Sequence, residues 1–150
     1  MIEETLRTEF EALKNDFEII RQQIESDVVR TELYKGEFYE LTPYSYQRHG
    51  FRQGKTVKRP DTVKNTKNLC IYGLNNQNQI DEVKVGCSIE NQFYHTFLYY
   101  TDNLVKSILY DNGKHLMNVC HNFFEGGKLK RLQLCGSHGS REENYIYKEN

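Results

Sequence analysis

The residue types that zinc accepts as ligands gather in one stretch of this sequence. His115, Cys120, His121, Cys135 and His138 lie within a window of 24 residues, and thiolates and imidazoles are the usual zinc ligands. Their spacing matches no recognised zinc pattern. Cys120 and His121 are neighbours, so in a strand their side chains would point to opposite faces and would not bind one ion together. We therefore expect neither a metal site nor another cofactor.

One segment, Gly136–Ser140, is a candidate for catalysis because it places serine, histidine and glycine together. It lacks the strand-to-helix context of a nucleophile elbow, since polar residues and a short apolar run follow it. The adjacent carboxylates Asp81 and Glu82 would point apart in a strand. The segment Gly54–Thr56 lacks the earlier glycine of a phosphate-binding loop. These patterns favour a protein that is not an enzyme.

Positive charge is concentrated in residues 48–67, which carry seven Lys and Arg side chains against the single acid Asp61. Glycine and proline interrupt this segment and large apolar residues are few, so it is predicted to be an exposed basic loop. Nearby aromatic residues such as Tyr44 and Tyr46 would suit single-stranded nucleic acid. The net charge of the whole chain is −1, which favours a solvated loop over a nucleic-acid site.

The first 28 residues carry an apolar stripe with spacings of 4, 3, 4, 3 and 4. The stripe consists of Leu6, Phe10, Leu13, Phe17, Ile20 and Ile24. This spacing predicts one long amphipathic helix over residues 1–28. Three heptads are short for a coiled coil, so we favour packing on the protein's own sheet and a monomer, with a helix-mediated dimer as the alternative.

From Gly36 onward the period changes to two, which predicts a first strand over residues 38–42 that ends at Pro43. Between residues 69 and 147, short apolar runs alternate with turns rich in Asn, Asp and Gly. The runs cover residues 69–74, 80–85, 93–100, 104–110, 116–124, 129–134 and 145–147. We predict an α+β fold in a single domain over 1–150, with the helix packed on a bent antiparallel β-meander of about seven to eight strands.

Aromatic residues precede several of these turns, and aliphatic residues follow them. The clearest examples are the segments Tyr110–Gly113 and Gly127–Leu129. With these units the region 69–147 resembles the YD-repeat and related bacterial antitoxin modules. The resemblance implies β-hairpin units that bind another protein.

The rest of the composition indicates where such a protein works. No apolar run approaches the roughly 20 residues of a membrane helix, and the first residues lack the profile of a signal peptide. Four cysteines stand singly, without a C-x-x-C pair, which is typical of reduced thiols. We expect a cytoplasmic protein with no membrane partner.

These patterns together predict a specific protein-binding module, most concretely an immunity protein that neutralises a cognate bacterial toxin by stoichiometric binding. Aromatic anchors and basic side chains would make the contact. The candidate binding residues are Tyr44, Tyr46, Tyr94, Tyr99, Arg48, Arg52, Lys55, Lys58 and Arg59. The alternative hypothesis is a small-ligand-binding β-barrel or half-barrel with the helix as its lid. A cavity inside the sheet would favour the alternative.

Overall fold

The computed structural model describes residues 2–44, 50 and 52–148. Along the chain the elements are α1 (Ile2–Leu13), α2 (Phe17–Asp27), β1 (Arg30–Lys35), β2 (Lys55–Thr56), the short 3-10 helix η1 (Pro60–Thr62), β3 (Leu69–Leu74), β4 (Ile80–Gly86), β5 (Phe93–Thr101), β6 (Leu104–Tyr110), β7 (Leu116–Glu125), β8 (Lys128–Gly136) and β9 (Gly139–Asn144). The predicted α+β class is confirmed. Neither helix in the described residues is long and apolar enough to cross a membrane.

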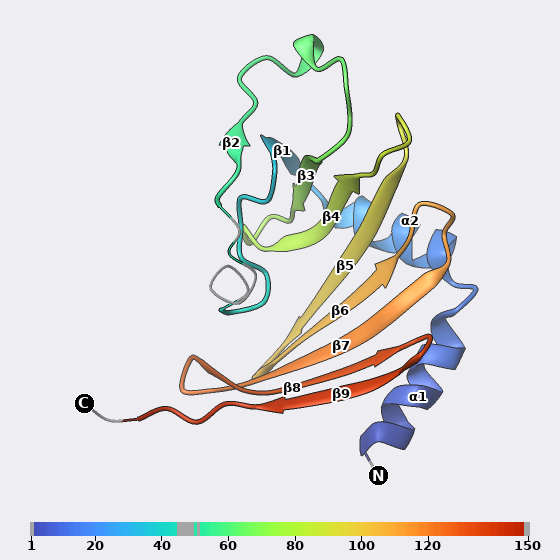
Figure 1. Ribbon diagram of the computed structural model, residues 1–150, viewed down its shortest axis with the longest axis vertical. Coiled ribbons are helices and arrows are strands. Elements are labelled where there is room, and N and C mark those ends of the chain that lie inside the picture. The colour runs from blue at the N-terminus through green and yellow to red at the C-terminus, as the bar shows by residue number, and fades with distance from the viewer. Residues whose placement is uncertain (1, 45–49, 51, 149–150) are drawn as a thin grey trace.

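The described strands form one antiparallel sheet in the order β2-β1-β3-β4-β5-β6-β7-β8-β9. Figure 1 shows the helices along one side of this sheet, while residues 37–42, which follow β1, lie on the other side. The meander is confirmed, but nine strands are present within the described residues, more than predicted. The sheet order begins at β2 and ends at β9, so this part of the chain forms an open sheet with two edges.

The prediction of a strand over residues 145–147 is wrong. The last strand is β9, which starts from a tight hairpin in which Gly136 pairs with Gly139. Gly139 has a φ of 153°, a conformation that favours glycine. The candidate catalytic segment Gly136–Ser140 is therefore the turn and the first residues of an exposed edge strand. Tyr145 and Tyr147 follow this strand and are half-buried.

The prediction of one long helix over residues 1–28 is also wrong, because a turn at residues 14–16 separates α1 from α2. Asn15 and Asp16 are weak helix formers whose side chains compete with the backbone for hydrogen bonds. The carbonyl of Leu13 at the end of α1 accepts hydrogen bonds from the hydroxyl of Tyr110 at 2.6 Å and from the backbone N–H of Asp16 at 3.2 Å. The turn lets α1 contact β7 and β8 while α2 contacts β4 and β5.

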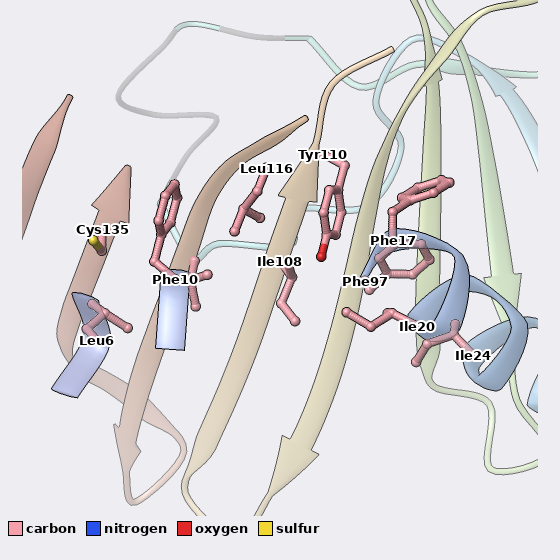
Figure 2. Packing of buried hydrophobic residues seen from close by; sticks show 11 residues of the cluster. Leu6, Phe10, Phe17, Ile20, Ile24, Phe97, Ile108, Tyr110, Leu116 and Cys135 are labelled. Atoms are coloured by element: carbon pink, nitrogen blue, oxygen red, sulfur yellow. The ribbon is translucent and has the colours of Figure 1, made fainter. Parts of the chain in front are cut away.

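The apolar stripe packs on the sheet as predicted. Figure 2 shows the stripe residues of both helices over side chains of the central strands. Phe17 lies with its ring centroid 5.0 Å from His95, 5.9 Å from Phe97 and 5.2 Å from Tyr110. Such ring contacts add to the free energy gained from burying the rings. The helices therefore cover one face of the sheet, and this core lies between them.

The expected strand over residues 38–42 is replaced by β1, which lies earlier in the chain and pairs with β3. Gly36 has a φ of 89° and ends β1 in a turn. Part of the predicted basic loop forms the short edge strand β2, which pairs with β1. The Lys and Arg side chains of residues 52–67 are exposed, in agreement with the sequence analysis.

Candidate binding cleft

Alternate side chains of the central strands point to opposite faces of the sheet. In β5, Phe97 packs beneath the helices, whereas Thr96 and Leu98 lie on the other face. In β6, Ile108 belongs to the helix-side core and Ser107 lies on the other face. We call this second surface the helix-free face.

The helix-free face is hollowed where short polar side chains stand beside longer apolar ones. Thr96 pairs with Leu109, which in turn pairs with Asn118 on the next strand. Leu98 pairs with Ser107. Because serine and threonine are shorter than leucine, the side chains in these rows leave space between them. The result is a cleft of about 340 Å³.

Residues 37–42 form a wall of this cleft, and the rest of its lining comes from β3, β4, β5, β6 and β7. The hydroxyl of Tyr72 accepts hydrogen bonds from the backbone N–H groups of Phe38 at 3.0 Å and of Tyr39 at 3.3 Å. The hydroxyl of Tyr39 donates to Glu32 at 2.6 Å. These three bonds tie the wall to β1 and β3.

The phenols at the cleft stay protonated at neutral pH. Burial raises the pKa of Tyr72 to about 12. The hydrogen bond to Glu32 raises the pKa of Tyr39, because the carboxylate favours the phenol that keeps its proton. Hydrogen bonds from Tyr34 and Tyr39 hold the pKa of Glu32 below its usual range. The phenols can therefore donate and accept hydrogen bonds, but they do not supply a base.

The same segment is anchored again at its far end by Tyr44. Its ring lies 5.9 Å from the ring of Tyr145, and its hydroxyl lies 3.0 Å from that of Tyr147. Tyr147 in turn donates to the carbonyl of Leu129 at 2.6 Å. The backbone N–H of Tyr44 donates to Glu40 at 2.6 Å, although the φ of Tyr44 is 69°. The wall is thus attached to the sheet at both ends.

Cys120 lies beside the cleft, because it pairs with the lining residue Ser107 across β6 and β7. Burial raises the pKa of Cys120 to about 11. The side chain is therefore a neutral thiol at neutral pH, and a thiol is a poor nucleophile compared with a thiolate. All four cysteines of the chain are free.

The helices pack on the face opposite to the cleft, so the hypothesis of a helix as the lid of a ligand site is corrected. Residues 37–42 take the position that the sequence analysis gave to the helix. The reason is that the apolar stripe is fully used in the core under α1 and α2. Apolar residues of the wall pack instead against Tyr72 and its neighbours.

Among the predicted binding residues that the structure describes, the tyrosines and the basic side chains lie at separate places. Tyr46 and Arg48 lie outside the described residues. The basic candidates Arg52, Lys55, Lys58 and Arg59 are exposed on β2 and the chain around it. Tyr94 and Tyr99 are half-buried on opposite faces of β5, and Tyr99 packs beside the helix-side core under the ammonium of Lys106, 5.2 Å from its ring centroid. Tyr44 contacts the C-terminal tyrosines, as described above.

The zinc-type residues are also dispersed. His115 is 82% exposed and pairs with Asp111 at 3.3 Å. His121 lies under α1, where its Nε2 is 3.1 Å from Glu9. Cys120 lies on the other face of β7. The described residues hold no group of three or more His, Cys, Asp or Glu side chains placed to bind one ion.

Sequence reasoning missed the residues that line the cleft. In the sequence these residues stand out only as polar side chains within predicted apolar strands, namely Thr96, Ser107, Asn118 and Asn122. Comparisons with protein-family models, curated proteins and solved structures found no match. The cleft is therefore the feature of the described residues from which a function can be inferred.

Proposed function

We propose that this protein binds a small ligand in the cleft on its helix-free face and releases it unchanged. The observation that carries this proposal is a hollow of about 340 Å³ with both apolar and polar lining. Ligand sites are concave, mostly apolar and equipped with a few polar groups that orient the ligand. The volume lies at the lower end of the range for such sites, about 300 to 1,000 Å³.

The chemistry of the lining supports binding rather than turnover. Asn118 and Asn122 offer amides, while Thr96 and Ser107 offer hydroxyls. These groups donate and accept hydrogen bonds without changing their charge. The phenols of the cleft are held protonated, so they too serve as hydrogen-bonding groups.

The proposal is tested by purifying the full chain from the cells that make it and recording native mass spectra. The cleft-filling variant Ser107→Leu is compared with Ser88→Leu, which places the same side chain in an exposed turn. We expect a small molecule to accompany the natural chain and Ser88→Leu, and to be lost from a folded Ser107→Leu. Retention by Ser107→Leu would contradict the proposal.

A second candidate is the specific protein-binding function, with toxin neutralisation as its concrete form. It is supported by the outer edge of β9, a six-residue strand with mostly exposed side chains. Such an edge can accept a strand from a partner. Co-expression with the product of the adjacent upstream gene tests this candidate. Rescue of growth together with co-purification would favour it over the small-ligand proposal.

A further inference from the structure

The charges around the cleft are unevenly distributed. Among the residues that the structure describes, Glu37 is the only charged side chain that lines it. Glu32 lies behind the wall, where its carboxylate accepts hydrogen bonds from the hydroxyls of Tyr34 and Tyr39. The guanidinium of Arg141 lowers the pKa of the neighbouring Cys120, and the carboxylate of Glu143 raises it. The described part of the lining therefore has no cation to pair with an anion.

The polar groups deeper in the cleft are uncharged. Asn122 is 3% exposed, and its amide donates to the carbonyl of Val105 at 3.4 Å. The half-buried Ser107 and Asn118 lie beside the apolar Leu98 and Leu109 in the two rows described above. Neutral amides and hydroxyls can satisfy a neutral polar group, whereas a buried anion needs a paired cation to offset its lost hydration.

From this arrangement, and on the basis of the function proposed above, we infer that the cleft selects neutral amphiphilic ligands and rejects their anionic counterparts. The apolar part of the ligand lies against the valines and leucines of β4, β5 and β6. Its polar group lies over Asn118, Asn122 and Ser107. Carboxylates, phosphates and sulfonates are excluded because the lining residues that the structure describes offer them no cation.

Two fluorescent probes with the same ring skeleton test this selectivity. N-phenyl-1-naphthylamine is neutral, and 8-anilinonaphthalene-1-sulfonate carries one added sulfonate. We expect saturable one-to-one binding of the neutral probe to the full chain, and binding of the sulfonate that is weaker by about tenfold or more. Circular dichroism of each sample checks that the protein is folded, since loosened proteins also bind the sulfonate.

Three variants locate the effect. Ser107→Leu should abolish binding of the neutral probe, and Ser88→Leu should leave it unchanged. Asn118→Lys adds a cation to the cleft and should strengthen sulfonate binding by about tenfold, because a paired charge offsets the loss of hydration.

The outcomes distinguish a failure of the selectivity for neutral ligands from a failure of ligand binding in the cleft. Equal binding of both probes, lost together in Ser107→Leu, would keep the ligand site and overturn the selectivity. A failure of Asn118→Lys to improve sulfonate binding would also overturn it. Absence of saturable binding by either probe, or binding that Ser107→Leu leaves intact, would overturn the ligand site itself.

Discussion

Glu9 links α1 to the sheet through Lys106 and His121, and its removal should weaken the fold. Its carboxylate lies 2.9 Å from the ammonium of Lys106 and 3.1 Å from Nε2 of His121. The hydrogen bond with His121, together with the contact to Lys106, lowers the pKa of Glu9 to about 2 against the opposing effect of burial. The charged form of Glu9 is therefore stabilised by folding.

The size of this effect follows from the pKa. A fall from the usual 4.5 to about 2 corresponds to roughly 3 kcal/mol at neutral pH, at about 1.4 kcal/mol for each tenfold change. The side chain of Glu9 is 23% exposed, so solvent screens part of the interaction. We expect Glu9→Gln to lower the free energy of unfolding by about 1 to 3 kcal/mol.

The pH dependence has a definite sign. Because the pKa is lower in the folded protein, the stabilisation is fully present above pH 4.5 and is lost as the pH falls toward about 2. Urea unfolding of the natural chain and Glu9→Gln, repeated over this range, measures the difference between them. Other carboxylates titrate in both proteins, so their contributions cancel in that difference.

Glu11→Gln is the matched control, since Glu11 pairs with Lys14 at 2.8 Å but both side chains are about half exposed. It should cost less than about 0.5 kcal/mol. The reasoning is refuted if the two variants cost the same, or if the cost of Glu9→Gln persists undiminished near pH 2.

Four other experiments, three with substitutions and one with trypsin, have expected outcomes. Phe17→Ala should lower the free energy of unfolding by about 3 to 5 kcal/mol in urea titrations, whereas Ile19→Ala, on the exposed side of α2, should change it by less than about 0.5. Tyr110→Phe removes the hydrogen bond to the end of α1 and should cost about 1 kcal/mol in the same assay. Trypsin should cut first within residues 52–67, as mass spectrometry of the first fragments would show. Asn118→Val should raise the free energy of unfolding by about 0.5 to 1 kcal/mol and weaken probe binding.

Each of the first three outcomes can be contradicted by a specific result. Equal costs for Phe17→Ala and Ile19→Ala would mean that α2 is not docked as described. An unchanged stability of Tyr110→Phe would mean that water replaces its bond. First cleavage outside residues 52–67 would show that this basic segment is protected.

The strands that sequence patterns predicted correctly are those with local signals at both ends. The bounds predicted for β3 and β6 agree with the structure, since each is an apolar run between polar segments. β9 gives no such signal, because its residues 139–144 are polar and lie at an edge of the sheet. The helix break was missed for another reason. The apolar stripe keeps its spacing across residues 14–16, so periodicity alone cannot detect the turn.

The cleft could not be predicted because it depends on strand register. Thr96 and Asn118 are 22 positions apart in the sequence, and they become next-nearest neighbours only because both pair with Leu109. The wall was misread as a strand because Phe38, Glu40 and Thr42 alternate with apolar residues. Instead, the backbone of Phe38 donates to the hydroxyl of Tyr72 and its ring stacks on Tyr34, so this segment packs over the sheet and does not pair as a strand. Both features are tertiary and leave little trace in a local window.

The two faces of the central strands carry different side chains, and we infer from the proposed ligand site that stability is not maximised on the cleft face. The helix-side positions of β5 and β6 carry large, fully buried side chains such as Phe97 and Ile108. The opposite positions carry Thr96 and Ser107, where valine or isoleucine would bury more apolar area. At Ser107 they would also suit a strand better. A face that only had to pack would favour those residues. The expected gain in stability of Asn118→Val, together with its loss of binding, tests this trade-off directly. If Asn118→Val instead destabilised the protein and left probe binding intact, the polar side chains of the cleft would be structural and would not define a ligand site.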